Sequence, residues 1–411
     1  MQNTYRKHGI LSNIFPVRSR SQNMTRILQV VCGIYPVHGG IEQVAKDIMY
    51  SFIGRHDVEQ KVICFNENAE DSGIITHRRE TVHDTLEGVE VIRCGSFVKA
   101  ASQLISLSFR RELALVMKNF APDVVILHYP NPFAAHFLLP FLKNNRRIKF
   151  IVFWHLDIVR QKILRMFFHR QNLELLERAD KVIATSQNYI QGSKYLSRFE
   201  EKCIVVPCCV QTERILITPE IQSIAENIRK EYAGKTISFS AGRLVPYKGF
   251  KYLIEASEHL DDDFAVLIAG GGKLNDELRE QAKNKPRVKL LGRISDEELN
   301  AYYLAADMIA FPSITKNEAF GIALAEGMYF GKPAVTFTIP GSGVNYVNLD
   351  GVTGIECPNM DVKAFAKAMM TLKNDPGLRK TLGENARNRV MQNFMYSTFK
   401  EKINSLIDEL H

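Results

Sequence analysis

Two glutamates near the end of the chain, Glu318 and Glu326, enclose a run of small and apolar residues at a predicted strand-to-helix junction. Residues 307–313 have the pattern of a short buried strand that ends in a loop, and residues 320–330 that of an apolar helix. Ligands of open α/β sheets bind at the carboxyl ends of the strands, and a helix N-terminus there offers free N–H groups to an anion. The spacing therefore predicts a site for a polar, anionic ligand.

A structural explanation exists for one of these glutamates but not for the pair. Acidic residues are common in the first turn of a helix because they complement its dipole, which would account for Glu318 alone. Glu326 lies between Ala325 and Gly327 on a helix otherwise built from Ile, Ala, Leu, Met and Phe. A carboxylate on so apolar a helix is costly to bury without a partner, so the pair indicates a functional site.

Two other predicted strand-to-helix turns carry residues suited to a phosphorylated ligand. Arg243 and Lys248 follow the first strand of the second half. They form either a cationic clamp for a diphosphate or an ordinary solvated basic turn. Gly39 and Gly40 follow the first strand of the chain, where glycine lets backbone N–H groups approach a ligand closely. Such glycines also occur simply because they relieve crowding.

The elements that must position these residues alternate along the whole chain. Strands are expected at 26–31, 60–65, 89–94, 123–129, 149–155, 181–186, 203–207, 236–241, 265–269, 288–291, 307–311, 333–337 and 353–357. Helices are expected at 40–54, 104–119, 132–143, 160–178, 187–199, 250–260, 275–283, 295–305 and 320–330, with a closing helical stretch from about 361 to 410. Val- and Ile-rich strands separated by helices indicate parallel sheets covered on both faces. We therefore predict an α/β fold of two Rossmann-like, doubly wound domains that face a cleft.

Length and composition limit the domain organisation. A chain of 411 residues is too long for one core, and at ~150 residues per domain two are expected. Residues 1–23 lack the apolar segment of a signal peptide, and we expect them to be a disordered tail. The domains then run from 24 to 215 and from 216 to 393, with the boundary inside 209–234. No apolar run approaches the ~20 residues of a membrane-spanning helix.

Charge and cysteine usage bear on partners and compartment. The net charge is +8. Residues 1–213 hold 28 Lys and Arg against 20 Asp and Glu, whereas residues 214–411 hold 25 of each. This excess in the first half indicates an anionic partner there, such as a membrane surface, a polyanion or a phosphorylated acceptor. Seven scattered cysteines fit neither a disulfide framework nor a metal site, which favours a reducing cytoplasm.

The run Glu-Ala-Phe-Gly-Ile-Ala-Leu-Ala-Glu, from 318 to 326, resembles the signature of the retaining glycosyltransferases of family 4, which have the GT-B fold. The resemblance implies that Glu318 contacts the donor sugar and that Glu326 holds the ribose hydroxyls of the nucleotide. It further implies that backbone N–H groups between them meet the diphosphate, at Phe320, Gly321, Ile322 and Ala323. In relatives of this fold the last helix crosses back to the first domain, and residues 394–411 are expected to do so here.

The same resemblance assigns roles to the other turns. Gly39 and Gly40 match a loop that faces the donor phosphates. Arg243 and Lys248 match a Gly-Arg…Lys-Gly motif and would neutralise the departing nucleoside diphosphate. His155 ends a buried strand beside the only tryptophan of the chain; a lone histidine there is more often structural, but the family has a catalytic histidine near the donor sugar at this position.

Shorter segments carry further expectations. Gly271, in a Gly-rich turn, is either a plain strand-to-helix link or a nucleotide contact, and the backbone of Arg293 and Ile294 is expected near the base. Segments 128–132 and 157–162 resemble a subset of bacterial enzymes that build O-antigen, capsule or exopolysaccharide, several of which use GDP-mannose. The acceptor-side residues implied by this subset are His128, Tyr129, Asn131, Asp157 and Arg160.

The chain also departs from the family pattern. Where the family often has Pro-Asn-Gly-Val-Asp, this chain has Pro-Cys-Cys-Val-Gln at 207–211, which leaves the role of Gln211 open. The run Asp261-Asp262-Asp263 precedes a strand instead of following one, so a solvated turn is expected there and not a metal site. No metal and no cofactor are predicted.

The expected activity is transfer of a hexose, mannose from GDP-mannose, to an acceptor on a polyprenyl diphosphate during synthesis of bacterial surface polysaccharide. The alternatives are a UDP-sugar-dependent glucosyl or N-acetylglucosaminyl transferase, a nucleotide-sugar epimerase, and a non-enzymatic anion-binding protein. No nucleic-acid-binding signature is present. The predicted location is cytoplasmic, peripheral to the anionic inner face of the plasma membrane. Candidate membrane contacts, which could equally form a solvated helix face over a buried Phe pair, are Lys143, Arg146, Arg147, Lys149, Arg160, Lys162, Arg165, Phe167, Phe168 and Arg170.

Overall fold

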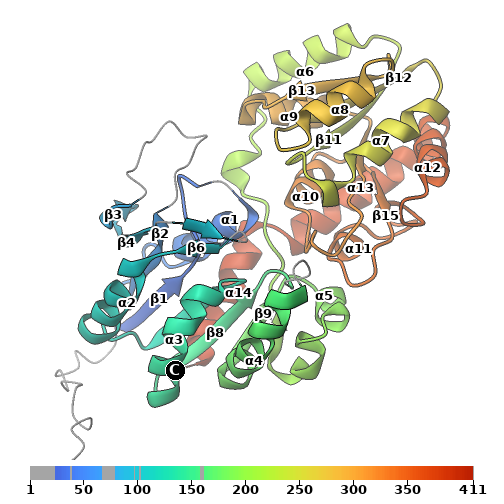
Figure 1. Cartoon of the computed structure of the whole chain (residues 1–411). Coiled ribbons are helices and arrows are strands. Elements are labelled where there is room, and N and C mark those ends of the chain that lie inside the picture. Colours follow the sequence, from blue (N-terminus) through green and yellow to red (C-terminus); the bar gives the residue numbers. More distant parts are fainter. Residues whose placement is uncertain are drawn as a thin grey trace, which may run out of the picture.

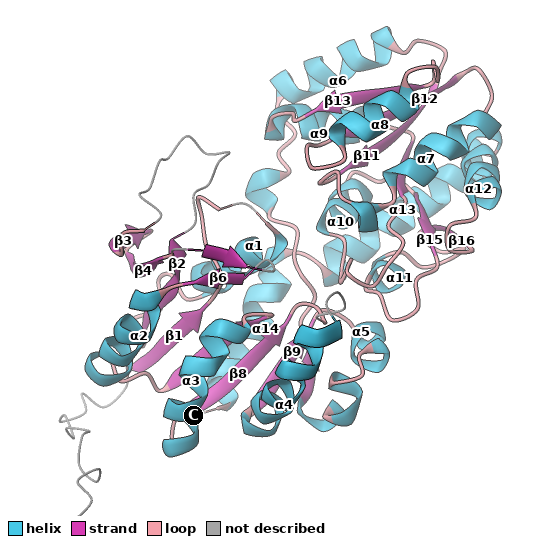
Figure 2. Cartoon of the chain, viewed as in Figure 1, coloured by secondary structure: helices cyan, strands magenta, loops and turns pink. Residues whose placement is uncertain are grey.

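A computed structural model of the chain describes residues 24–37, 39–66, 79–96, 98–100, 103–157 and 162–410. It contains two α/β domains, each built on its own sheet, that meet along one side (Figure 1). Figure 2 shows helices on both faces of each sheet. The prediction of two doubly wound domains is confirmed.

The sheet of the first domain has eight strands in the order β10-β9-β8-β7-β1-β2-β4-β3. Neighbouring strands are parallel except for β3, which runs antiparallel to β4 at the edge. The strands are β1 (Thr25–Val30), β2 (Val58–Asn66), β3 (Val82–Leu86), β4 (Val89–Gly95), β7 (Val124–Tyr129), β8 (Lys149–Trp154), β9 (Lys181–Ala184) and β10 (Cys203–Val205). The helices are α1 (Gly40–Ser51), α2 (Leu107–Asn119), α3 (Pro132–Asn144), α4 (Lys162–Arg178) and α5 (Gln187–Gly192).

The sheet of the second domain has six parallel strands in the order β13-β12-β11-β14-β15-β16. The strands are β11 (Thr236–Ala241), β12 (Phe264–Ala269), β13 (Val288–Gly292), β14 (Met308–Phe311), β15 (Ala334–Phe337) and β16 (Gly354–Cys357). The helices are α6 (Pro219–Glu231), α7 (Phe250–Ala256), α8 (Asn275–Ala282), α9 (Asp296–Ala305), α10 (Ile322–Tyr329), α11 (Val344–Val347), α12 (Val362–Asn374) and α13 (Pro376–Asn393). The last helix, α14 (Tyr396–Glu409), lies against the first domain.

Side-chain alternation along the strands sends neighbouring residues of the first domain into cores on opposite faces of the sheet, because successive residues of a strand point to opposite faces. Ile27 and Ile126 pack into a core that includes residues of α1 and α14 and continues into the second domain. Leu28 and Leu127 point the other way, into a core shared with α2, α3 and α4. The strands are apolar on both faces because helices cover both.

Three segments of the first domain differ from the sequence-based expectations. Residues 103–105 form a strand, β6, that pairs with β5 (Val98–Ala100), so α2 begins at Leu107 and not at 104. The side chain of Ser106 fixes this start by accepting a hydrogen bond from the backbone N–H of Phe109 at 3.1 Å, as an N-cap residue does. Strand β3 was not predicted. The expected helix 187–199 ends at Gly192, where its chain packs closely on Gly341 of the second domain.

The region expected to contain the domain boundary, 209–234, includes a complete helix. Thr218 caps α6 by accepting from the backbone N–H of Ile221 at 3.3 Å, and Pro219 occupies the first turn, where its missing N–H costs nothing. This helix packs against α9 of the second domain. The chain therefore crosses between the sheets within the short stretch from β10 to α6.

The chain crosses between the domains a second time next to the first crossing. The backbone N–H of Val210 donates to the carbonyl of Phe394 at 2.7 Å, and that of Tyr396 donates to the carbonyl of Val210 at 3.1 Å. The helix that follows, α14, lies against α1 of the first domain, where Asn404 donates to the carbonyl of Ser51 at 3.2 Å. The two crossings thus form one paired connection.

Gln211, whose role the sequence left open, anchors this connection to the first domain. Its Nε2 donates to Oδ1 of Asp47 on α1 at 2.5 Å, and the Cys209 thiol donates to Oδ2 at 3.3 Å. Gln43 adds a further bond to Asp47 at 2.7 Å. Burial raises the pKa of Asp47, while these hydrogen bonds act in the opposite direction. The unusual Cys-Cys-Val-Gln sequence therefore provides the donors that a buried carboxylate requires.

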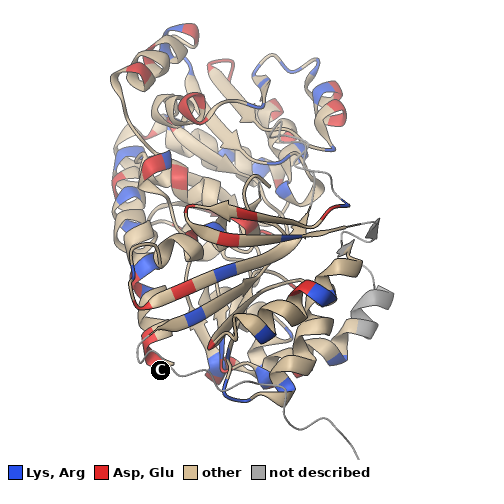
Figure 3. Cartoon of the chain, turned by 90° about the vertical axis from the view of Figure 1, so that its left-hand side faces the viewer, with Lys and Arg blue, Asp and Glu red and all other residues tan. Residues whose placement is uncertain are grey.

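Charged residues are mixed over the molecule. On the face drawn in Figure 3, Lys and Arg alternate with Asp and Glu over both domains. In the first domain, Lys143 and Arg170, two of the expected membrane contacts, both pair with Glu174, at 2.9 and 3.0 Å. Within the described part of the chain, no helix combines the length and the hydropathy required to cross a bilayer.

Candidate functional site

The two residues that the sequence placed at neighbouring turns, Lys248 and Glu318, form an ion pair. Lys248 Nζ lies 2.5 Å from Glu318 Oε2, and the side chains are only 12% and 10% exposed. Ser313 also donates to Glu318 Oε2, at 3.1 Å. Gly249, with φ of 68°, lets the turn after Lys248 pass directly over the carbonyl of Pro312, where a Cβ would clash. The parallel neighbours β11 and β14 thus bring the two turns together.

Beyond Glu318 the chain presents unpaired backbone donors. Gly321 adopts φ of 98° and precedes α10. Within the described part of the chain, the backbone N–H groups of residues 320–323 find no acceptor. Orphan N–H groups at a helix start favour an anion. Ser342 holds the preceding backbone in place, since its hydroxyl donates to the carbonyl of Glu318 at 2.5 Å.

Glu326 lies one turn into α10, and its side chain is only 9% exposed. Arg214, from the connection between the domains, approaches it at 3.9 Å (Nη1 to Oε1) and also lies 3.6 Å from Asp296. Burial raises the pKa of Glu326, and the Arg214 guanidinium opposes this effect. A buried carboxylate with one distant cationic partner retains hydrogen-bonding capacity for a ligand.

The glycine-rich turns of the second domain pack against one another. Gly270 donates to the carbonyl of Gly292 at 2.7 Å, and Leu244 donates to that of Gly271 at 2.9 Å. Arg293 and Ile294 follow β13 at the same end of the sheet, and a Cβ on Gly271 would meet the Arg293 side chain. Arg243 is exposed, with its Nη2 3.5 Å from the Tyr247 hydroxyl. These residues line one edge; their contact with a nucleotide stays a prediction.

The first domain contributes the residues after β9 and β8. Thr185, directly after β9, donates to the carbonyl of Ala319 at 2.7 Å. The carboxyl ends of the two sheets therefore face each other at Glu318. Gly39 and Gly40, which start α1, lie at the carboxyl end of β1 in the same sheet, and their approach to a donor stays a prediction.

His155 follows β8 and is 5% exposed. Its Nε2 lies 3.0 Å from Nδ1 of His128, and its ring stacks on Phe153 with centroids 4.3 Å apart. His128, expected on the acceptor side, is 1% exposed and lies behind His155. Its other nitrogen, Nε2, lies 3.1 Å from the Gln29 amide. His128 therefore contacts His155 and is enclosed in this structure, and its role on the acceptor side stays a prediction.

Three further residues expected on the acceptor side are buried in this structure. Tyr129 is completely buried and stacks on Trp154 at 3.8 Å. Asn131, also completely buried, caps α3 by accepting from the N–H of Ala134 at 3.2 Å. Asp157, 7% exposed, accepts hydrogen bonds at both oxygens. The Tyr129 hydroxyl and Asn131 Nδ2 are enclosed without a hydrogen-bond partner among the described residues, and the roles of these three residues on the acceptor side stay predictions. Arg160 lies outside the described residues.

Asp157 links the two domains. Its Oδ1 accepts from the Trp154 indole at 3.0 Å and from the Ser193 hydroxyl at 2.8 Å. Its Oδ2 accepts from Lys316 at 2.7 Å, and the same ammonium donates to the carbonyl of Gly192 at 3.1 Å. Lys316 lies two residues before Glu318, so the ion pair fixes the loop that carries this glutamate.

Lys316→Ala should lower kcat about tenfold, because the loop before Glu318, the predicted sugar contact, loses its tether and small displacements of a group that acts on a substrate are costly. Unfolding free energy should fall by only about 1 kcal/mol, since the ammonium is partly exposed. Steady-state kinetics and urea unfolding test this, with Lys363→Ala, an exposed lysine of α12, as control. An unchanged kcat would contradict the tether.

The buried histidines predict a pH-dependent stability. Burial lowers the pKa of His128 to about 3, and that of His155 well below its usual value. Below pH 6.5 the unfolded chain binds protons that the folded chain does not, so stability falls as pH decreases. For His128 the slope approaches about 1.4 kcal/mol per pH unit only well below pH 6.5, where the unfolded histidine is fully protonated. Between about pH 7 and 5.5 its contribution averages about 0.8 kcal/mol per pH unit, and urea unfolding of His128→Asn should show a slope smaller by that amount; an equal slope would contradict it.

Sequence reasoning missed several residues that contact the site: Gln29, Thr185, Arg214 and Lys316. None belongs to a motif, and each reaches the site from a separate segment. Only Lys316 gave a signal, as a cation two residues from Glu318. No cluster of metal-ligating side chains occurs among the residues with described positions; Asp261 and Asp263 instead accept from Lys373.

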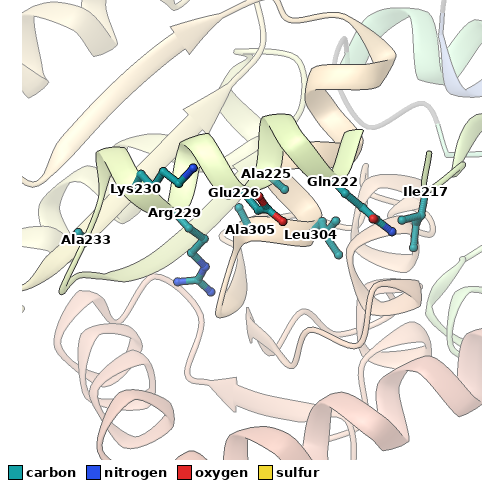
Figure 4. Close-up of a pocket in the computed structure, with 9 residues that line it drawn as sticks. All are labelled: Ile217, Gln222, Ala225, Glu226, Arg229, Lys230, Ala233, Leu304 and Ala305. Atoms are coloured by element: carbon teal, nitrogen blue, oxygen red, sulfur yellow. The ribbon is translucent and has the colours of Figure 1, made fainter. Parts of the chain in front are cut away.

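A pocket of about 820 Å³ opens elsewhere, between α6 and the end of α9 (Figure 4). Its lining residues are Ile217, Gln222, Ala225, Glu226, Arg229, Lys230, Ala233, Leu304 and Ala305. Arg229 is held by Asp307 through two hydrogen bonds of 2.9 Å. None of the predicted site residues lines this pocket, so it plays no part in the site.

Comparison with known proteins gives consistent results for both halves. Residues 38–214 match a family model described as Glycosyltransferase Family 4, and residues 222–389 match one described as Glycosyl transferases group 1. The chain is 28% identical over 374 residues to the O-antigen chain mannosyltransferase C of Escherichia coli, covering 90% of this chain and 94% of that protein. It is 30% identical over 360 residues to the D-rhamnosyltransferase WbpZ of Pseudomonas aeruginosa, covering 87% and 88%.

Solved structures agree in fold. The sucrose-phosphate synthase of Thermosynechococcus elongatus superposes with a TM-score of 0.75 at 18% identity, covering 94% of this chain and 99% of that one. The Anabaena protein Alr3699/HepE in complex with UDP and glucose superposes with a TM-score of 0.72 at 19% identity, covering 93% and 99%.

Proposed function

The chain belongs to the family 4 glycosyltransferases of the GT-B fold, and we propose that it transfers mannose from GDP-mannose, with retention, to a polyprenyl-diphosphate-linked oligosaccharide. The supporting observation is the similarity to an O-antigen mannosyltransferase over 90% of the chain. A second relative of similar coverage is a D-rhamnosyltransferase. D-Rhamnose is 6-deoxymannose, so both named activities concern sugars of one configuration.

The proposed chemistry places the diphosphate over the start of α10. The free N–H groups of residues 320–323, together with Lys248 and Arg243, would take the phosphate charge that grows as the glycosidic bond breaks. The acceptor hydroxyl would attack the face that the phosphate leaves, and a phosphate oxygen would accept its proton. This path retains the anomeric configuration without an enzyme nucleophile.

When the donor binds, Lys248 and Glu318 would give up their contact with each other and bind the donor instead. Lys248 and Glu318 are desolvated before the donor arrives, since each neutralises the other. In the complex the ammonium would turn to the diphosphate and the carboxylate to sugar hydroxyls. Preformed, water-poor charges stabilise a transition state more strongly than solvated ones do. Glu326 would accept from the ribose hydroxyls one turn further along the helix.

We further propose that the protein works in the cytoplasm at the inner face of the plasma membrane, during synthesis of surface polysaccharide such as O-antigen, capsule or exopolysaccharide. The excess of eight positive charges in residues 1–213 supports an anionic surface or lipid-linked acceptor for the first domain. Transfer should need no metal, and activity should therefore persist in EDTA.

Thermal-shift measurements with GDP, UDP, ADP and their mannose, glucose and N-acetylhexosamine conjugates test the donor. Release of nucleoside diphosphate then tests turnover. Stabilisation by GDP and hydrolysis of GDP-mannose are expected. Stabilisation by UDP but not GDP would support a UDP-glucose- or UDP-N-acetylglucosamine-dependent transferase instead. No turnover with any donor, combined with tight binding to nucleic acid, would overturn the proposal.

A further inference from the structure

A buried chain of hydrogen bonds runs from the backbone of α1 to His155. It passes through Gln29 on β1 and His128 on β7. Both side chains are fully enclosed, with exposures of 0% and 1%. His128 Nδ1 lies 3.0 Å from His155 Nε2. The two rings are within 13° of coplanar, with centroids 5.2 Å apart, as an in-plane hydrogen bond between ring nitrogens requires. One nitrogen must therefore donate and the other accept.

The backbone of α1 determines the orientation of the Gln29 side-chain amide, that is, the positions of its oxygen and its nitrogen. In one orientation, Nε2 lies 3.3 Å from the carbonyl oxygen of Ala45 and 3.1 Å from His128 Nε2, while Oε1 lies 3.3 Å from the N–H of Met49. In the reverse orientation, Gln29 Oε1 would face the carbonyl oxygen of Ala45, which is also an acceptor. Gln29 Nε2 would then face the N–H of Met49, which is also a donor. Backbone groups of a helix cannot exchange these roles. Gln29 is consequently a donor toward His128.

The proton positions follow from this donor. Because His128 Nε2 accepts from Gln29, a neutral His128 carries its proton on Nδ1 and donates it to His155 Nε2. His155 Nε2 accepts, so a neutral His155 carries its own proton on Nδ1. Burial lowers the pKa of both rings, which keeps them neutral.

The free end of this chain lies at His155 Nδ1. Within the described part of the chain this atom has no protein partner, and it is not among the enclosed polar atoms that lack one. The N–H at this position is therefore not enclosed and is available to a bound molecule.

We propose that Gln29 and His128 are positioning residues that hold His155 as the neutral Nδ1–H form, so that it acts as a hydrogen-bond donor to a substrate oxygen and never as a base. The tautomer follows from the protein alone. Its consequence for rate rests on the proposed function, in which His155 lies beside the donor sugar.

Nitrogen NMR of protein labelled with 15N-histidine tests the tautomer directly, with His128→Asn and His155→Asn used for assignment. Both rings are expected to show protonated Nδ1 and unprotonated Nε2. In Gln29→Leu the donor that fixes the tautomers of His128 and His155 is lost, and a second population with Nε2–H on His155 should appear. Gln60→Leu is the matched control, because Gln60 donates to the carbonyl of Met49 on the same helix at 2.9 Å and does not contact His128.

Kinetics test the positioning role. His128→Leu removes the bond to His155 and should lower kcat/KM about tenfold or more. His128→Asn can still donate from its amide and should stay within about threefold of wild type. A role in packing alone would not discriminate between these two variants when unfolding free energies are equal.

The outcomes separate the two proposals. Wild-type His155 protonated on Nε2 would overturn the inference even if GDP-mannose is turned over. Equal rates for His128→Leu and His128→Asn would overturn the positioning role. A protein that turns over no donor but shows the expected nitrogen signals would refute the proposed function and leave the tautomer assignment standing.

Discussion

Replacing Lys248 with methionine should lower kcat about 10³-fold, the largest effect expected of any single substitution in this protein. The ammonium is nearly buried, lies 5.0 Å from the Phe311 ring centroid, and pairs with Glu318 at 2.5 Å. In so dry a setting, a cation aimed at a departing phosphate contributes about 4 kcal/mol to transition-state stabilisation. The loss should appear in kcat and not in KM, because the charge that it stabilises develops as the bond breaks.

Loss of stability is the main competing explanation for such a result, since Lys248→Met leaves Glu318 buried without its cation. Breaking a buried pair in this way destabilises proteins by roughly 3–5 kcal/mol. The double variant Lys248→Met with Glu318→Gln removes both charges and should recover most of that stability while remaining inactive. Lys251→Met, at an exposed site on α7, should change neither quantity. A Lys248→Met protein that keeps a tenth of wild-type kcat would refute the clamp.

Glu326→Gln should weaken GDP binding about 10- to 100-fold while raising the stability of the free protein. Hydrogen bonds to a charged acceptor are worth about 1.5–3 kcal/mol, and the ribose offers two hydroxyls to this carboxylate. Burial raises the pKa of Glu326, so ionising it in the folded chain costs stability. The glutamine removes this cost, and binding and stability change in opposite directions.

The pH dependence of unfolding gives a second test of the expected gain in stability in Glu326→Gln. Glu326 has a folded pKa above the unfolded value of 4.5, so its cost is absent below pH 4.5 and grows as pH rises through the folded pKa. The stability advantage of Glu326→Gln should thus vanish in acid. Calorimetric titration with GDP and urea unfolding measure the two effects. Glu356→Gln is the matched control: burial also raises the pKa of Glu356, but its loss should leave GDP binding intact. A Glu326→Gln protein that binds GDP normally would refute the ribose role.

Element order and fold class could be read from the sequence because they depend on local patterns. A buried parallel strand is a short apolar run, a helix has its own period, and glycine or a polar cap marks where each begins. Strands such as β11 and β12 were therefore placed to within a residue or so of their ends. The hairpin β5–β6 and the edge strand β3 were missed because they lack a continuous apolar run and lie beside helices and loops of similar composition.

The sequence by itself determined which residues are candidates for chemistry at the strand ends. Glu318 and Glu326 were candidates because a charge on an apolar element requires a function or a partner, whereas Lys248 and His155 were candidates from their places at strand ends and from the family resemblance. Only the tertiary structure decided the partners. Lys316 and Asp157 are 159 residues apart in the chain, and Gln211 and Asp47 are 164 apart.

Such pairs depend on strand order and on where the chain crosses between the domains, which no local pattern records. The sheet order places β7 between β8 and β1, and this order alone brings Gln29, His128 and His155 into one hydrogen-bonded chain. The positions of the candidate groups along the chain were therefore readable from local patterns. The long-range packing of buried polar groups, each of which must find a partner once water is excluded, set their orientation and charge.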